Sequence, residues 1–520
     1  MKRLMFVFYL LLSLGVKAQM VMDSVSVAER NNGRQIWGKT LGFDKNIRYV
    51  MGHDSVAAIV TCDTTKSGKW KDEGTLFFVD AQTLDVAWKR PLDMSLCRVS
   101  DMTKYGLLLS TTLKGTNKSL LTLKNRKTGE SIWTQYLYPV YTDDSLDIVI
   151  GLDKVGSSNT FAYRLHDGTL LWNKEIPMSK NIGWGKAVMM DSTHLVVVGD
   201  DINEININTG VIHKVKAKTG ISDSKGIMQL ALLNVVSIGT GLALGSSVLY
   251  YYYNLNPYSI TGLTSNVLRG DSCVYVSDRN NLFRLGADSL SQMAKFEFYN
   301  HEASTARLMM KNDKIFMLNY GYGYSLMRGN VKCGKPFLAV FDAKNLILEK
   351  FLPLYDKKHI MNDGLLNENG VFLAGGDKAV YLSFQDSSIC TYDWSVRKNG
   401  ALTYIPRETL YGYHGEVEKL TSLKATEEIC PMLTDKEKIC LFNRKMNLLD
   451  SYENYETFST CFRSGDVICV QNNKDKSNFW LIQPDGSAYA KMKWNPNSVF
   501  KTDRGALVVY RNKVSYFSIQ

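Results

Sequence analysis

The most informative absences in this 520-residue sequence concern histidine, cysteine and clustered positive charge. Its seven histidines lie far apart, so the ligand spacing of a metal site is missing. Its nine cysteines form no Cys-x-x-Cys pair, which excludes attachment of a c-type haem. No run of five Lys or Arg residues occurs. The sequence therefore predicts no metal ligands and no nucleic-acid partner.

Catalytic motifs are missing as well. There is no Gly-x-Ser-x-Gly nucleophile elbow and no glycine-rich phosphate loop followed by Lys-Ser or Lys-Thr. Adjacent carboxylates such as Asp143 and Asp144 point to opposite faces if they lie in a strand. General acid–base catalysis needs both groups in one cleft. We therefore name no catalytic residue.

The N-terminus has the pattern of a signal peptide. Lys2 and Arg3 precede an apolar run over residues 4–16, and this run is too short to span a bilayer comfortably. Small residues precede Gln19, where a signal peptidase would cut. We expect residues 1–18 to be removed by cleavage near Ala18, which leaves an exported protein in the periplasm, in the cell envelope or secreted.

The plentiful residues favour β-structure. Glycine and tyrosine are abundant and proline is scarce, as in proteins built from short strands and turns. A strand, a polar turn and a second strand recur at roughly 40-residue spacing, which is typical of propeller blades. Copies of this unit occupy residues 74–92, 119–137, 159–177 and, more faintly, 200–217, and weaker copies follow residue 263.

The turns of these repeats explain the position of their tryptophans. Asp or Asn starts each turn, and glycine takes the positive φ that a tight hairpin needs. Trp133 and Trp172 follow Gly129 and Gly168 by the same interval, so each indole points in a fixed direction from its strand. We interpret these tryptophans as packing between neighbouring blades and not as ligand contacts.

The termini complete the repeat. Residues 505–520 supply inner strands, and residues 28–41 supply the outer strand that they lack. One blade closed from both ends seals the ring and removes exposed edges. The sequence predicts an all-β fold: a single large β-propeller over residues 19–520, with about eight four-stranded antiparallel blades (range seven to ten) and one apolar hairpin insertion.

The turn-and-tryptophan pattern resembles the Asp-x-x-Thr-Gly-x-x-x-Trp repeat of the quinoprotein (PQQ) dehydrogenase-like β-propeller family, most clearly over residues 28–217. Enzymes of that family use pyrroloquinoline quinone and calcium, and they carry a disulfide between adjacent cysteines. No two cysteines are adjacent in this sequence. The resemblance therefore implies a non-enzymatic, exported bacterial member that binds no cofactor, because one propeller scaffold hosts many roles.

Two groups of tyrosines are candidate binding residues. Tyr320, Tyr322 and Tyr324 lie on a glycine-rich hairpin, where exposed rings could stack on a sugar or form a protein-binding patch. The alternative is a hairpin tip packed on its neighbouring blade. The second group is Tyr250, Tyr251, Tyr252 and Tyr253.

This second group belongs to an uncharged segment. Residues 226–268 contain no Lys, Arg, Asp, Glu or His, although 22% of the chain is charged. The segment falls between two repeats, so we predict an apolar insertion over residues 221–262. A large apolar surface needs a partner or a cover. The insertion would therefore contact a membrane or a protein, or fold over the propeller.

Together these features predict an exported envelope propeller that acts as a protein- or ligand-binding scaffold, with residues 226–262 contacting a membrane or a partner. A glycan is a further candidate ligand. The alternative function is a glycan-active enzyme with its site in the central channel, where clustered polar side chains would be expected.

Overall fold

The computed structural model describes most of the chain beyond the N-terminal segment. The described residues are 21–116, 118–154, 157–176, 186–199, 201–217, 263–299, 303–325, 329–354, 363–366, 369–375, 378–386, 388–393, 402–404, 410–413, 421–422, 429–434, 438–452 and 456–519.

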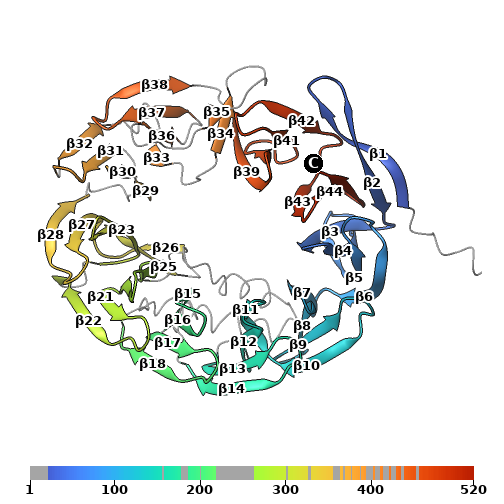
Figure 1. Cartoon of the computed structure of the whole chain (residues 1–520), viewed down its shortest axis with the longest axis horizontal. Helices are drawn as coiled ribbons and strands as arrows, with labels where there is room; N and C mark the ends of the chain where they lie inside the picture. Colours follow the sequence, from blue (N-terminus) through green and yellow to red (C-terminus); the bar gives the residue numbers. More distant parts are fainter. Residues whose placement is uncertain are drawn as a thin grey trace, which may run out of the picture.

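The described chain is all-β, and its sheets form a ring (Figure 1). The hydrogen-bonded order resolves ten four-stranded antiparallel units in these residues. The predicted propeller fold is thus confirmed, with a blade number at the upper end of the predicted range. In the part of the chain that the structure describes, we find no helix with the length and apolar character needed to span a bilayer.

Blades 1 to 5 follow the chain in order. Blade 1 has β3 (Asn46–His53), β4 (Val56–Thr64), β5 (Trp70–Asp80) and β6 (Val86–Asp93); blade 2 has β7 (Cys97–Met102), β8 (Gly106–Thr112), β9 (Ser119–Asn125) and β10 (Ser131–Tyr136); blade 3 has β11 (Tyr138–Asp143), β12 (Ile148–Leu152), β13 (Asn159–Arg164) and β14 (Leu170–Glu175); blade 4 has β15 (Lys186–Met189), β16 (His194–Val198), β17 (Ile202–Asn206) and β18 (Ile212–Val215); blade 5 has β19 (Leu268–Arg269), β20 (Cys273–Ser277), β21 (Asn281–Gly286) and β22 (Gln292–Glu297).

Blades 6 to 10 complete the ring and include two additional hairpins. Blade 6 has β23 (Ala306–Lys311), β24 (Lys314–Asn319), β27 (Phe337–Asp342) and β28 (Leu348–Pro353), with the hairpin β25 (Tyr322–Ser325) and β26 (Gly329–Lys332); blade 7 has β29 (Asp363–Leu366), β30 (Gly370–Gly375), β31 (Lys378–Ser383) and β32 (Ile389–Asp393); blade 8 has β33 (Leu402–Tyr404), β36 (Ile429–Thr434), β37 (Ile439–Asn443) and β38 (Leu448–Tyr452). Blade 9 has β39 (Glu456–Ser464), β40 (Val467–Asn472), β41 (Phe479–Ile482) and β42 (Ala488–Met492), and β34 (Leu410–Tyr413) and β35 (Thr421–Ser422) extend its sheet. Blade 10 has β43 (Ser498–Thr502), β44 (Gly505–Tyr510), β45 (Lys513–Ser518) and β2 (Gln35–Gly42), and β1 (Val21–Arg30) follows β2 in the sheet.

The core lies between the blades. The second strand of blade 1, β4, is buried from Ala57 to Cys62 because neighbouring blades cover both of its faces. Nine hydrophobic clusters of described residues each join two adjacent blades. Outer strands such as β10 are mostly exposed instead, with one buried position in β10. Burial of apolar surface between sheets therefore holds the ring together.

Strands from both ends of the chain close the ring, as predicted. β2 pairs antiparallel with β45 of the C-terminal segment and becomes the outer strand of blade 10. The structure adds a contact that the sequence did not predict: β1 pairs with both β2 and β42, the outer strand of blade 9. Blades 9 and 10 therefore share one continuous sheet, and this continuity leaves no open edge between them.

Tryptophans connect the first blades to their neighbours. Trp133 of blade 2 donates its indole N–H to the carbonyl of Leu165 in the turn of blade 3, at 2.8 Å. Gly168 in that turn has φ of 72°, and an added Cβ would lie 2.6 Å from the Trp133 ring. Trp88 and Trp172 make the equivalent contacts with the turns of blades 2 and 4. The predicted packing role is confirmed, and we call this arrangement the Trp–turn contact.

Other turns hold a large side chain where the Trp–turn contact has glycine. Leu84, Leu290, Leu346 and Met446 all have positive φ and are buried. In that backbone conformation a side chain costs strain, and apolar burial offsets the strain. Trp37 of blade 10 stands beside the turn that contains Leu84, and its side chain is 59% exposed. In this turn the buried side chain is therefore Leu84, and the indole of Trp37 remains largely exposed.

Candidate functional site

A buried carboxylate replaces apolar packing in blade 4. Glu204 on β17 is fully buried and pairs with His213 on β18. Blade 3 pairs Ala162 with Trp172 at the same ladder position. Blade 4 therefore has a Glu–His pair where the Trp–turn contact would begin. Glu204 faces blade 5, since Ile202 on the same side of β17 packs into the cluster shared with that blade.

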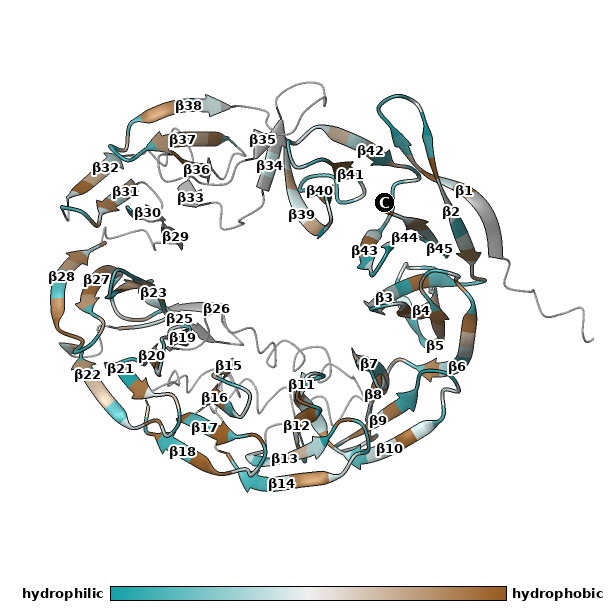
Figure 2. Cartoon of the chain, viewed as in Figure 1, coloured by the Kyte–Doolittle hydropathy of each residue, from teal (hydrophilic) through white to brown (hydrophobic). Residues whose placement is uncertain are grey.

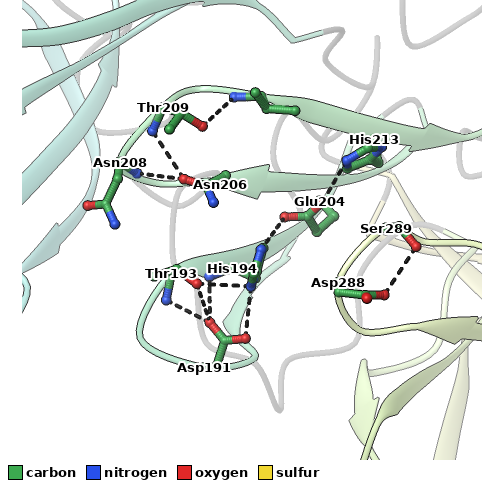
Figure 3. Close-up of polar contacts among 11 residues, drawn as sticks. Asp191, Thr193, His194, Glu204, Asn206, Asn208, Thr209, His213, Asp288 and Ser289 are labelled. Carbon is green, nitrogen blue, oxygen red and sulfur yellow. Dashed lines mark hydrogen bonds and ion pairs between the residues drawn. The ribbon is translucent and has the colours of Figure 1, made fainter.

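Two histidines flank this carboxylate (Figure 3). His194 Nε2 lies 3.9 Å from Oε1 of Glu204, and His213 Nε2 lies 4.0 Å from Oε2. The other ring nitrogen of His194, Nδ1, lies 2.8 Å from Oδ2 of Asp191. Asp288 approaches from the turn between β21 and β22 of blade 5. These five residues form the Glu204 cluster.

The surroundings of Glu204 and His194 raise their pKa values, so the cluster binds protons near neutral pH. Burial, with smaller effects from Asp191 and Asp288, raises the pKa of Glu204 to about 7, although His194 opposes the rise. The hydrogen bond with Asp191 raises the pKa of His194 above its ordinary value. Neither oxygen of Glu204 accepts a hydrogen bond from a described residue. Burial of this side chain is more costly when the carboxyl is ionised than when it is protonated.

The chemistry available to the Glu204 cluster is proton binding at the interface of blades 4 and 5. Within the described residues, no group of three His, Cys, Asp or Glu side chains is arranged to hold a metal ion. Sequence reasoning missed this cluster because the fourth repeat is faint. The available signal was the loss of its tryptophan, since His213 stands at that position.

A second polar cluster joins the inner ends of blades 1 to 3. His53 at the end of β3 lies 3.2 Å from Asp144, which follows β11, and 2.8 Å from Asp54. The backbone N–H of Lys104 donates to Asp144 at 2.8 Å. Burial and the nearby Asp144 raise the pKa of Asp101 on β7. Because β3, β7 and β11 lie on the inside of the ring (Figure 1), this cluster connects three blades there.

Hydrophobic residues occur along the outer strands of the ring (Figure 2), and several of their side chains are exposed. They lie at or beside the start of the outer strands of blades 2 to 6 and of blade 8, and their exposed fractions range from 37% to 51%. Each of these outer strands is the last strand of its sheet in the described chain. We call this set the outer apolar row: Ile132, Leu170, Val211, Met293, Leu348 and Leu449.

The structure describes only part of the predicted tyrosine sites. Tyr320 is 2% exposed and belongs to the cluster between blades 6 and 7, so it is a packing residue and presents no exposed ring. Tyr322, on β25, is half-buried, and its ring centroid lies 5.6 Å from that of Tyr320. The side chain of Tyr324 and the whole of Tyr250–Tyr253 lie outside the described residues, so their binding roles stay predictions.

Comparison with solved structures finds matches at low sequence identity. BamB from Moraxella catarrhalis is 11% identical, and the match covers 91% of this chain and all of that one, with a TM-score of 0.34. Hsv2 from Kluyveromyces lactis is 9% identical over 72% of this chain and 96% of its own, with a TM-score of 0.28. The computationally designed protein Ika8 is 8% identical over 87% and 97%, with a TM-score of 0.26. No family model matches the chain, and neither does any curated protein sequence.

Proposed function

We propose that this protein is an exported envelope scaffold that binds a protein partner along its outer apolar row. The supporting observation is the repetition of exposed apolar side chains on outer strands of successive blades. Solvent-exposed apolar groups that recur along one surface are typical of interaction sites. A partner strand could also pair with an outer strand, whose free edge offers unpaired backbone groups.

The charges on these strands favour a specific partner over self-association. Lys174, Lys214, Lys295 and Lys350 lie on the outer strands of blades 3 to 6. Lysine on an exposed edge opposes the pairing of one copy with another, because like charges would meet. We infer that the row binds a different protein, one that carries apolar side chains.

A charge-matched pair of variants tests the outer apolar row. The row variant carries Ile132→Glu, Leu170→Glu and Met293→Glu. The control places the same three charges on polar, exposed positions of the same strands: Thr134→Glu, Asn173→Glu and Gln292→Glu. We expect the amount of partner protein that co-purifies with the row variant from envelope extracts to fall at least about tenfold. The reason is that burying a charge at an interface costs several kcal/mol. The control should keep it, and equal recovery by both variants would contradict the proposal.

The insertion is proposed as a second contact, with a membrane or with the same partner. Residues 226–262 fall between β18 and β19 in the sequence. Deletion of residues 226–262 is expected to reduce co-fractionation with membranes or to remove a co-purifying protein. Unchanged fractionation and an unchanged set of partners would refute this role while leaving the outer apolar row untouched.

A further inference from the structure

In nine of the described blades, a turn joins the third strand to the fourth. At one position of this repeat, blade 2 has a charged residue and the other eight blades do not. The position lies on the third strand, in the last pair of residues that the two strands form before the turn. In blade 2 this residue is Lys124, and its partner on the fourth strand is Ser131. In the other blades this residue is apolar and buried, and in blades 1 and 3 to 8 it packs towards the preceding blade. Those residues are Val79, Tyr163, Ile205, Leu285, Phe341, Leu382, Phe442 and Ile482.

Lys124 is nevertheless buried, with 8% of its surface exposed. It lines a cavity of about 240 Å³ between blades 1 and 2. Its Nζ donates to Oγ of Ser131 at 2.7 Å. Thr111 and Thr122 contribute further hydroxyl groups to the lining. The hydroxyl of Thr111 also donates to the thiol of Cys97 at 3.3 Å.

A second cation lines the same cavity from blade 1. Arg90 on β6 is half-buried, at the ladder position that blades 5 and 6 fill with Phe296 and Leu352. Burial and the nearby Arg90 lower the pKa of Lys124. Lys124 and Arg90 thus place two positive charges at positions where blades 5 and 6 have apolar side chains.

Neither cation has a counter-ion among the residues that the structure describes. No carboxylate in the described chain forms an ion pair with Lys124 or Arg90. Asp93 lines the cavity, but its Oδ1 accepts hydrogen bonds from the backbone and hydroxyl of Ser95. Burial of an ammonium group without a counter-ion is unfavourable, because the lost hydration is not replaced. A bound anion would remove that cost and explain why the lysine is kept.

We propose that the cavity between blades 1 and 2 binds a small oxyanion, a carboxylate or a phosphate group, between Lys124 and Arg90. The guanidinium can hold two oxygens of such a group in a bidentate pair. The ammonium holds a third contact, and the hydroxyl of Ser131, which accepts from Lys124, can donate to the anion. This site is independent of the outer apolar row, so either can fail without the other.

Anion titrations of the mature chain test the site. Phosphate, sulfate, acetate and succinate are each added at constant ionic strength maintained with chloride, and binding is followed by calorimetry and by the shift in unfolding temperature. Saturable binding of phosphate or sulfate identifies a tetrahedral oxyanion, and saturable binding of acetate or succinate identifies a carboxylate. Binding by none of the four beyond the effect of chloride overturns the proposal.

The variant Lys124→Met separates binding from folding. Methionine resembles the apolar residues of the other blades, so the variant is expected to fold and to be at least as stable as the wild type without ligand. Its dissociation constant for the bound anion should rise about tenfold or more, because one charge-assisted hydrogen bond is lost. The control Lys127→Met removes an exposed charge from the adjacent turn and should leave binding unchanged. Equal anion affinity in Lys124→Met and the wild type would refute the site.

Discussion

The substitution Trp133→Ala is expected to lower the free energy of unfolding by about 3–5 kcal/mol. The indole is 7% exposed and packs in the cluster between blades 2 and 3. Its N–H donates to the Leu165 carbonyl, which would be left without this donor. The substitution thus removes apolar burial and one hydrogen bond together. Urea titrations followed by circular dichroism measure the effect without relying on tryptophan emission.

Trp37→Ala is the matched control, because Trp37 belongs to the same repeat position in blade 10. The turn that faces Trp133 has Gly168 at the position with positive φ, whereas the turn beside Trp37 has Leu84 at that position. The side chain of Trp37 is therefore 59% exposed. We expect this control to change the free energy of unfolding by less than about 1 kcal/mol. Similar losses in the two variants would contradict the Trp–turn contact as the source of stability.

The same pair of residues shows why the fold could be predicted from the sequence. Glycine at a positive φ and an aromatic residue at a fixed interval are local signals, and each blade repeats them without reference to the others. Gly168 and Trp172 mark their turn and strand unambiguously. Closure by both termini could be predicted because the C-terminal strands lack an outer partner that residues 28–41 supply.

The blade number was harder to predict, because the turns of blades 5, 6 and 8 have no glycine at the position with positive φ. Leu290, Leu346 and Met446 take the positive φ that glycine takes in blades 2 to 4. No sequence pattern marks a leucine as left-handed, since burial against the neighbouring blade is what offsets the strain. The repeats after residue 263 therefore look weaker in sequence than they are in structure.

The polar sites could not be predicted, because they depend on which strands are neighbours. Lys124 looks like any lysine beside a turn, and only the ladder shows that the other blades bury an apolar residue there. His53 and Asp144 are far apart in the chain and meet because β3 and β11 both lie on the inside of the ring. Tyr320 shows the opposite case, since a glycine-rich context indicated exposure and packing against blade 7 buries it.

Ionisation of Glu204 is expected to make the protein less stable as the pH rises through neutrality. The pKa of this carboxyl is raised from 4.5 to about 7 in the folded chain. Its stabilising contribution is therefore complete below about pH 4.5 and is lost as the pH rises through about 7. The difference between the pKa values of Glu204 in the unfolded and folded chain corresponds to about 3 kcal/mol of stability. Solvent screening of the charges near the partly exposed His194 reduces this value to about 2 kcal/mol.

His194 acts in the same direction. Its pKa is raised by the hydrogen bond with Asp191, so its contribution is complete below about pH 6.5 and is lost as the pH rises further. The pKa of Asp191 is lowered by the hydrogen bonds from His194 and Thr193, although burial alone would raise it. The contribution of Asp191 is lost only in strong acid, below about pH 4. The Glu204 cluster should therefore be most stabilising in mildly acidic conditions.

The substitution Glu204→Gln tests this dependence through its slope with pH. Glutamine keeps the shape of the side chain and cannot ionise, so about 2 kcal/mol of the loss between pH 5 and pH 8 should disappear. Urea titrations at a series of pH values measure it, and Glu130→Gln, at an exposed turn position, should keep the wild-type slope. An unchanged slope in Glu204→Gln would mean that the carboxyl is ionised at low cost. Since neither of its oxygens accepts a hydrogen bond from a described residue, an additional donor would then have to reach it.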